Sequence, residues 1–382
     1  MSGLEMPLKA PVRCDLVQPL AKWLDGDMQN SFEPTNPLQL VVPKPDFKSS
    51  ACLSDLKRLA ALRNCLSESL LDSHKSAIEE HNALRDCHDY HATLLEFEKR
   101  GFPTLDDKFN GINLTWKGAF ATQQQETHHS LVWDRACTMW NIAALEWYMA
   151  GTTDLTTKDG CKTAIARCQS AASTLAVLRD LASSDDYMTV DVAPCMISFW
   201  EKVVLAQGQF CIYKMANLGD TVRQHSVLGY LMKATFDLYN EALQAAQDPR
   251  LLSEVPKQAE KWGAHCKAKS MIACAKAEFH QAIDYRMSKQ HGNEIYRLRI
   301  CVTMINEAAQ FVGSAGLTMP EVDALKRLAK DRLATSEKDN YSVYKDMIPD
   351  ELEDIRSQQL VKSNLGLTPE MLQPKVKLFQ NV

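Results

Sequence analysis

The sequence predicts a mainly α-helical protein, and three observations support this prediction. Apolar residues recur at every third or fourth position over long stretches, which is the period of one helix face. The chain has only 15 glycines and 15 prolines in 382 residues, well below the level of fibrous or low-complexity proteins. Hydrophobic residues make up 45% and charged residues 24%, the usual mixture of folded globular proteins.

Helical periodicity covers most of the chain, and its stretches are mostly joined by short loops. We expect helices over the following residues: 54–98, 133–150, 157–181, 194–215, 221–247, 253–287, 293–312 and 320–334. Such a succession is typical of a bundle or of a solenoid of helical hairpins of the tetratricopeptide type. Trp133, Trp140 and Trp147 recur every seventh residue with small residues between them. We therefore expect all three rings on the buried face of one helix.

Short extended segments are predicted near the N-terminus and after Gly111. The candidates are 12–17, 38–42 and 112–116. The first two are bounded by prolines, which favours edge strands or irregular structure. His128 and His129 follow a run of glutamines and are expected in a loop or at a helix start. From residue 339 the periodicity weakens, and we expect a tail that packs across the helices.

Charge, hydropathy and cysteine use exclude several classes of protein. A net charge of −5 gives no global signal for nucleic acid, whose phosphates require a basic surface. No apolar run approaches the ~20 residues of a membrane span, and the N-terminus lacks the apolar core of a signal peptide. The 12 cysteines include no CxxC pair. We expect a cytoplasmic chain with free thiols.

No familiar catalytic or cofactor motif is present, so we expect neither an enzyme nor a cofactor. Phosphate-binding glycine loops, HExxH, GxSxG and EF-hand loops are all missing. His81, Cys87, His88 and His91 have spacings that can place ligands on one helix face. Without a second ligand pair elsewhere, a polar helix face with a buried cysteine is favoured, and no metal is expected.

Two stretches allow a binding function as well as a structural one. Residues 211–243 carry more apolar positions than one core stripe needs, including Val227 and Leu231 as i,i+4 neighbours. Periodicity alone favours their burial over an exposed groove for an amphipathic helix. Residues 251–300 hold nine basic and five acidic side chains. A solvated face is favoured there over contact with an anionic membrane or an acidic partner.

Six segments, in matching order over about residues 10–365, resemble the BRO-one domain family of Alix-like, ESCRT-associated proteins. These segments are LTWKGAF at 114–120, WDRAC at 133–137 with NIAAL at 141–145, LAQGQ at 205–209, AEFHQ at 277–281, GNEI with RL at 292–298, and KDN at 338–340 with Tyr344 and Pro349.

The resemblance implies one boomerang-shaped domain over 8–370, followed by a C-terminal tail over 371–382. Its core would be a tetratricopeptide-like solenoid, with a small N-terminal antiparallel β-sheet. The implied function is non-catalytic. The domain would bind the C-terminal amphipathic helix of Snf-seven-class ESCRT-III subunits in endosomal sorting and membrane scission. We expect a cytoplasmic monomer recruited to endosomes, with peripheral contact to anionic endosomal membrane as an additional partner and no nucleic acid.

The resemblance also implies site residues. Ile212 takes the place of a family aromatic residue, and Val227 and Leu231 match two aliphatic positions, with Leu228 as an alternative to Val227. We predict that Ile212, Val227 and Leu231 form an exposed apolar patch. Tyr344 matches a tyrosine that is phosphorylated in some relatives, although a structural role is favoured. A rhophilin-like Rho-pathway scaffold and another helical peptide-binding adaptor remain alternatives. Both a stand-alone protein and a domain of a longer scaffold are compatible with the sequence.

Overall fold

The computed structural model describes residues 4, 6–14, 16, 50–72, 76–99, 113–120, 124–183, 189–219, 224–317 and 319–374. The chain forms two compact units. The larger unit comprises Met1–Met6, Trp147–Ala176 and Cys195–Leu365, and the smaller unit comprises Pro7–Glu146, Val177–Pro194 and Gly366–Val382. The predicted division into a domain over 8–370 and a tail over 371–382 stays a prediction.

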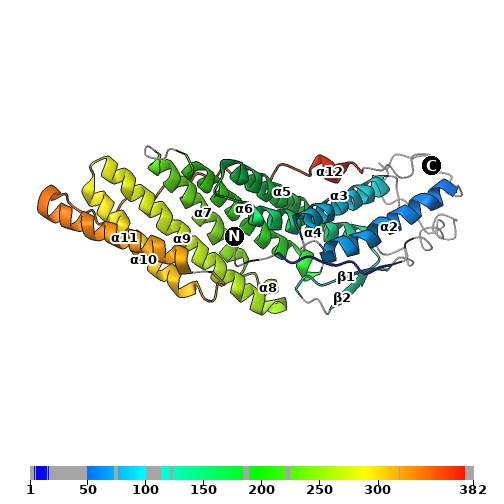
Figure 1. Ribbon diagram of the computed structural model, residues 1–382. Helices are drawn as coiled ribbons and strands as arrows, with labels where there is room; N and C mark the ends of the chain where they lie inside the picture. Colours follow the sequence, from blue (N-terminus) through cyan, green and yellow to red (C-terminus); the bar gives the residue numbers. More distant parts are fainter. Residues whose placement is uncertain are drawn as a thin grey trace, which may run out of the picture. The chain divides into compact units, whose positions relative to one another are not determined.

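The smaller unit combines helices with a two-stranded sheet (Figure 1). Its elements are α2 (Ser50–Asp72), α3 (Ala77–Lys99), β1 (Leu114–Lys117), β2 (Gln125–His128), the first part of α4 (Leu131–Thr152), the end of α5 (Lys158–Ala182), the short helix η4 (Val190–Val192) and α12 (Pro369–Leu372). The predicted helix 54–98 is two helices that pack against each other. The second is preceded by Ser76, whose hydroxyl accepts from the Glu79 backbone N–H at 3.3 Å and donates to the Glu79 carboxylate at 3.0 Å. The first of these contacts is that of an N-cap serine, which satisfies a backbone N–H of the first turn.

The small antiparallel sheet confirms part of the strand prediction. β1 pairs with β2, so that Thr115 lies opposite Thr127 and their hydroxyl oxygens are 2.8 Å apart. Pro11 forms an isolated bridge to Trp116 on the other side of β1. The Val12 backbone N–H donates to the Thr115 carbonyl at 2.8 Å, so the start of the candidate 12–17 joins the sheet. The candidate 38–42 lies outside the described residues.

β2 contradicts the expectation of a loop or helix start around His128. Its four side chains are Gln, Glu, Thr and His, and none of them is buried. A strand with no buried side has no apolar alternation, so periodicity cannot reveal it. Its place is decided by pairing with β1.

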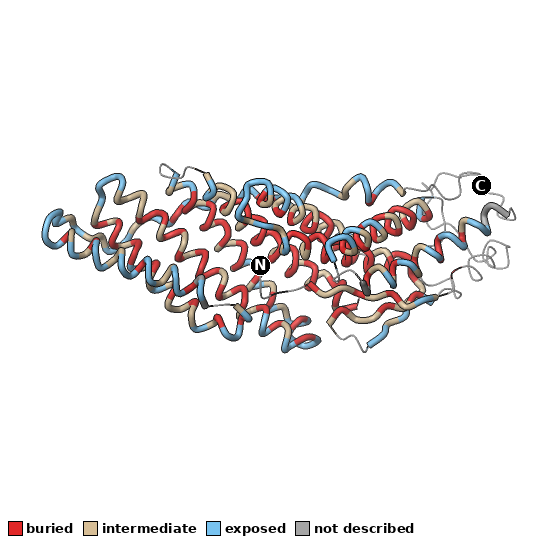
Figure 2. The backbone as a smooth tube through the Cα atoms, in the orientation of Figure 1, coloured by how far each residue is buried: buried red, intermediate tan, exposed pale blue. Residues whose placement is uncertain are grey.

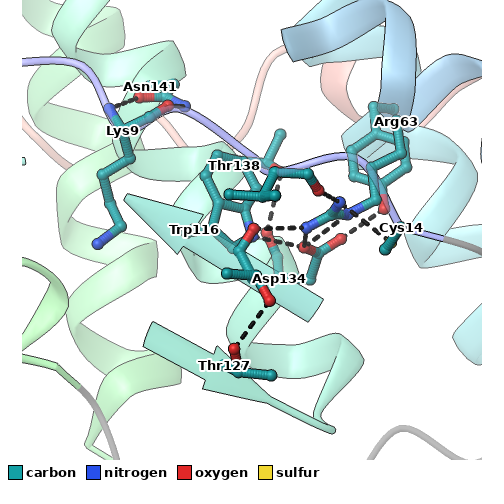
Figure 3. Close-up of polar contacts among 11 residues, drawn as sticks. Lys9, Cys14, Arg63, Trp116, Thr127, Asp134, Thr138 and Asn141 are labelled. Atoms are coloured by element: carbon teal, nitrogen blue, oxygen red, sulfur yellow. Dashed lines mark hydrogen bonds and ion pairs between the residues drawn. The ribbon is translucent and has the colours of Figure 1, made fainter. Parts of the chain in front are cut away.

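A buried polar cluster joins the helices of the smaller unit to its sheet (Figure 3). Asp134 on α4 forms an ion pair with Arg63 on α2, in which Nη2 of Arg63 lies 3.1 Å from Oδ1 of Asp134. The indole N–H of Trp116 on β1 donates to the same oxygen at 2.6 Å, and the Tyr90 hydroxyl on α3 donates to the other. A buried carboxylate is tolerated only when its oxygens are paired in this way.

A second buried ion pair holds the N-terminal segment of the smaller unit. The ammonium of Lys9 lies 2.5 Å from Asp191, and the Lys9 backbone exchanges hydrogen bonds of 2.7 and 2.8 Å with the Asn141 side chain. Burial alone would raise the pKa of Asp191, but Lys9 and the Ala119 backbone N–H lower it below its usual value. Asp191 is therefore a carboxylate at neutral pH.

The larger unit is a succession of antiparallel helices, which confirms the predicted fold class (Figure 1). After the end of α4 and most of α5, its helices are α6 (Pro194–Asn217), α7 (His225–Ala245), α8 (Pro249–Glu254), α9 (Pro256–Met287), α10 (His291–Phe311), α11 (Met319–Asp339) and the short π-helix η5 (Asn340–Tyr344). α7 packs on α9, α9 on α10, and α10 on α11. Figure 2 shows buried and exposed positions alternating along these helices. The predicted helix 253–287 is divided at Pro256, which starts α9.

Two of the three periodic tryptophans are buried as predicted. Trp133 and Trp140 are 1% and 0% exposed. Trp147 differs from the prediction, because its ring is only partly buried. It lies 5.3 Å from Trp200, which in turn contacts Trp262 at 5.5 Å. These three rings form an aromatic cluster within the larger unit.

The cysteines are mostly interior residues. None of those whose side chains are described forms a disulfide, and most of them are buried. Within the described residues, no three His, Cys, Asp or Glu side chains are placed to hold a metal ion. No helix in the same part of the chain is long and apolar enough to cross a membrane.

Candidate partner-binding surface

An extended segment of the larger unit crosses its helices and is called the strap here (residues 353–365). It begins at α10 and α7, where Arg297 donates to the Glu353 carbonyl and Lys233 lies 3.0 Å from Asp354. It ends on α5, where the Ser173 hydroxyl accepts from the Leu365 backbone N–H at 3.3 Å. The expected packing of the C-terminal region across the helices is thus confirmed for this segment.

Gln209 on α6 fastens the middle of the strap. Its side-chain N–H donates to the Gln358 carbonyl at 2.9 Å. Its side-chain oxygen accepts from the backbone N–H groups of Leu360 and Val361 at 3.0 and 3.2 Å. No strand among the described residues pairs with the strap, so a side-chain amide supplies the donor and the acceptors that these backbone groups need.

The neighbouring glycine allows this close approach. A Cβ atom at Gly208 would lie 2.8 Å from a methyl carbon of Val361 and 3.1 Å from Cys168. Gln207, the preceding residue, accepts from the Tyr239 hydroxyl at 3.2 Å. The motif at 205–209 therefore holds α5, α6, α7 and the strap together through contacts inside the larger unit.

The residues predicted to form an exposed patch differ widely in exposure. Val227 on the first turn of α7 is 39% exposed. Ile212 is 8%, Leu231 2% and Leu228 0% exposed. The prediction of an exposed patch is therefore wrong for Ile212 and Leu231, whose side chains belong to the interior of the helix array. Leu228, the alternative to Val227, is buried as well. A role of these four residues in partner binding stays a prediction.

Exposed apolar side chains that the sequence analysis missed lie at the end of α6. Leu218, directly after α6, is 39% exposed, and Met215 is half-buried. They follow Ile212 at i+3 and i+6, so the three residues form a continuous stripe that becomes more exposed toward the helix end. This spacing was readable in the sequence, but its exposure was not. Ile212, Met215, Leu218 and Val227 are called the α6–α7 stripe below.

A polar chain underlies this end of the array. The Tyr213 hydroxyl is 3.0 Å from Nε2 of His280 on α9, and Nδ1 of His280 is 3.0 Å from Nδ1 of His225. Burial, then His225 and Lys276, lower the pKa of His280 to about 4. Burial also lowers the pKa of His225. Both rings are neutral at neutral pH, so one can donate and the other accept.

Tyr344 lies in η5 and is accessible. Its ring is 43% exposed and stacks on His291 at 3.5 Å between centroids. The backbone beyond it is held by Asn340, whose side chain accepts from Asp346 N–H at 2.9 Å and donates to its carbonyl at 3.0 Å. Gly292 is required here, because a Cβ atom would lie 2.0 Å from the Met347 carbonyl oxygen. Phosphorylation of Tyr344 stays a prediction.

The histidine cluster on α3 belongs to the smaller unit and packs against α12. Nδ1 of His91 lies 2.9 Å from the Met371 carbonyl oxygen. Burial lowers the pKa of His91 to about 4, and burial raises the pKa of the Cys87 thiol. A neutral imidazole and a protonated thiol are the states expected of interior packing groups.

Comparison with known proteins gives consistent matches. The BRO1-like domain model matches residues 5–382. Programmed cell death 6-interacting protein of Xenopus laevis is 27% identical over 394 residues, covering 99% of this chain and 41% of that protein. The pH-response regulator protein palA/RIM20 of Saccharomyces cerevisiae is 24% identical over 375 residues, covering 98% of this chain and 49% of that protein. The chain spans less than half the length of these two relatives.

Solved structures with the same fold include domains studied with partners. The structure described as an ALIX BRO1 CHMP4C complex has a TM-score of 0.77, with 22% sequence identity and full coverage of both chains. A second structure, described as a basis for endosomal targeting by the Bro1 domain, has a TM-score of 0.71 and 16% identity. It covers 95% of this chain and 92% of that one.

Proposed function

The chain belongs to the BRO1-like domain family, and from this premise we propose that it is a non-catalytic module that binds an ESCRT-III subunit. The ligand is the C-terminal amphipathic helix of a Snf-seven-class subunit, and the binding surface is the α6–α7 stripe. Binding would recruit the chain from the cytoplasm to endosomes. The ALIX domain of the same fold was solved as a complex with CHMP4C, which supports this class of partner.

The observation that carries the proposal is the graded exposure of the α6–α7 stripe. An amphipathic helix needs apolar contacts at its own i, i+3 and i+4 positions. Leu218 and Val227 offer such contacts at 39% exposure each. Ile212, at 8%, offers only the edge of its side chain.

The strap supports the same role by holding the platform rigid. Gln209 lies one turn before Ile212, and it bonds both the strap and the Leu231 carbonyl, the latter at 3.4 Å. A surface that is ordered before binding loses less conformational entropy when the partner docks. The strap is therefore a supporting element of the proposed site.

A non-catalytic role agrees with how the buried charges are used. Asp134, Asp191 and Glu294 are all buried, and each is paired with a cation within its own unit. Glu294 contacts Arg332 at 3.1 Å and the Ser336 hydroxyl at 2.9 Å. A catalytic carboxylate would need to face a substrate pocket with convergent groups. Asp134 and Glu294 instead join helices, and Asp191 holds the N-terminal segment.

The test is calorimetric titration of the full chain with a synthetic peptide of the C-terminal helix of a Snf-seven-class subunit. Val227→Asp should weaken binding by about 2 kcal/mol or more, because a carboxylate would be buried at the contact. Its melting temperature should change little, since Val227 is exposed. Val343→Asp is the matched control, because Val343 is 67% exposed on η5 and lies outside the α6–α7 stripe.

Leu231→Asp has a different expected outcome. Because Leu231 is 2% exposed, this change should unfold or strongly destabilise the larger unit. Equal peptide affinities for wild type, Val227→Asp and a charge at Leu218 would contradict the proposed surface. If no ESCRT-III helical peptide binds the folded wild type, the proposed function itself is wrong. Peptides from other ESCRT-III subunits then test the class preference.

A further inference from the structure

A second hollow surface of the larger unit lies far along α7 from the α6–α7 stripe. It has a volume of about 890 Å³ and is formed by the end of α7, by α8, by the first turns of α9 and by the end of α10. It is called the α9 groove here. Val227 and Leu243 are 16 residues apart on α7, or about 24 Å at 1.5 Å per residue. One short helix segment therefore cannot be centred on both surfaces.

The α9 groove has an apolar lining. Leu243, Leu252 and Phe311 contribute large side chains from three different helices. Leu252 is 47% exposed, and Phe311 is partly buried against the core formed by α9, α10 and α11. Large apolar side chains that converge on a hollow from separate elements are typical of partner contacts.

Small residues at the base of the groove leave room for a second helix. Ala246, Gly263 and Ala264 line it without long side chains. A Cβ atom added at Gly263 would meet only a methyl carbon of Leu243, at 3.8 Å. This is an ordinary van der Waals distance, so a Cβ atom would fit at Gly263 without displacing a neighbour. Small floor residues let the backbone of a docked helix approach closely.

The rim of the groove is cationic. Lys257, Lys261 and Lys267 all line it, against a single acidic residue, Glu260. Among the residues that the structure describes, none of these three ammonium groups forms an ion pair with a carboxylate. Arg250 on α8 is instead paired with Glu254 at 2.7 Å. The rim thus presents positive charge that is complementary to an acidic ligand.

We propose that the α9 groove is a second docking surface, and that its occupant is an acidic amphipathic helix of a partner protein. Apolar side chains of that helix would contact Leu243, Leu252 and Phe311, while its carboxylates would face the three lysines. A flat anionic membrane fits less well, because the apolar side chains line a hollow and Glu260 would face the lipid phosphates. The proposal is independent of the function assigned to the α6–α7 stripe.

The test uses a fluorescein-labelled peptide of about 18 residues, or ~27 Å of helix, with leucine at every third or fourth position and glutamate elsewhere. Fluorescence anisotropy with the full chain measures its affinity. The triple change K257E/K261E/K267E should weaken binding by at least about tenfold. The triple change K326E/K330E/K338E on α11 is the matched control, because it alters the net charge equally outside the groove. It should leave the affinity unchanged.

Two further variants separate groove occupancy from general electrostatic attraction. Gly263→Phe should fill the groove and abolish peptide binding. Leu252→Asp should weaken peptide binding by about tenfold. It should not disturb folding, because Leu252 is 47% exposed. A peptide of the same composition in scrambled order should not bind. The ESCRT-III peptide should bind all groove variants as it binds wild type.

Unchanged acidic-peptide binding by the charge-reversal and Leu252→Asp variants would overturn the proposal. The proposal would also be overturned if the ESCRT-III peptide displaced the labelled peptide, because the two peptides would then share the α6–α7 stripe. Vesicles containing phosphatidylserine provide the remaining arm. If the triple groove variant loses vesicle binding while its peptide affinity is unchanged, the lysines contact a membrane and the proposed occupant is wrong.

Discussion

The guanidinium of Arg63 lies 3.1 Å from the carboxylate of Asp134, and both side chains are sealed from solvent at 1% and 0% exposure. Together they join α2 to α4 in the smaller unit. Trp116 and Tyr90 donate to the same carboxylate, so all three donor groups depend on it. Removal of the negative charge would leave a buried guanidinium without its counter-ion.

Asp134→Asn should therefore destabilise the smaller unit by about 3–5 kcal/mol, the range for breaking a buried ion pair on one side. Urea unfolding followed by tryptophan fluorescence measures the change. Glu68→Gln is the control, because it removes the carboxylate from the exposed pair with Arg13, where almost no change is expected. A similar small loss for Asp134→Asn would mean that the buried pair contributes nothing net.

Gln209→Leu should release the strap. The change leaves the Gln358 carbonyl and the N–H groups of Leu360 and Val361 without partners, which should cost about 2–4 kcal/mol. Arg356 and Lys362 lie within the strap, so limited trypsin digestion with mass spectrometry should find faster cleavage there. Gln359→Leu is the control, since Gln359 is exposed and its side chain donates to the Val361 carbonyl within the strap. Equal cleavage rates in both variants would argue that other contacts hold the strap.

Trp140→Ala and Trp147→Ala should differ in cost. Trp140 is fully buried, donates to the Pro7 carbonyl at 2.8 Å and meets Phe120 edge to face, so its removal should cost about 3–5 kcal/mol. Trp147 is partly exposed and should cost about 1–3 kcal/mol. Thermal melts of both variants make the comparison. A larger loss for Trp147 would indicate that its contacts with Trp200 dominate.

Acid should destabilise the chain partly through His280. Its pKa is lowered to about 4 in the folded state, so below an unfolded pKa near 6.5 the unfolded chain binds more protons. Stability is thus fully present above pH 6.5 and is lost as the pH falls toward 4, by at most about 3 kcal/mol. Two protonated rings would also place N–H donors against each other in the His225 contact.

The measurement compares wild type with His280→Gln between pH 7.5 and about 4. Glutamine keeps a donor and an acceptor but does not titrate in this range. Other buried histidines, including His91 and His265, remain in both proteins. The difference between the two pH profiles therefore isolates His280. Parallel profiles would show that this histidine does not contribute to the acid sensitivity.

Sequence patterns predicted most helices within a few residues, because a helix is stabilised by hydrogen bonds and side-chain contacts that lie close in the chain. The start of α9 at Pro256 also has a local cause. Proline lacks a backbone N–H, and this is tolerated only in the first turn of a helix. β2 escaped prediction because its partner strand, and not its own side-chain pattern, stabilises it. The small sheet depends on hydrogen bonds between two separate segments, β1 and β2, and not on contacts within one segment.

The six segments that carry the family resemblance contain buried residues that connect one structural element to another. Asp134 receives three donors, Gln209 binds the strap, and Asn340 closes the turn after η5. Such residues are restricted by contacts with particular partners, so they make a recognisable pattern without touching a ligand. The resemblance therefore predicted the fold more directly than it predicted the binding surface.

Local periodicity and composition were enough to predict the helix succession and the apolar character of α6 and α7, and the quoted motifs were enough to suggest the family. Packing between the helices places Leu231 in the interior and leaves Val227 and Leu218 facing solvent, which the sequence did not reveal. Residues at i and i+4 lie on one side of a helix, but neighbouring helices decide how much of that side is covered. The same reason hid the α9 groove, since Leu243, Leu252 and Phe311 meet only after α7, α8 and α10 have packed around α9.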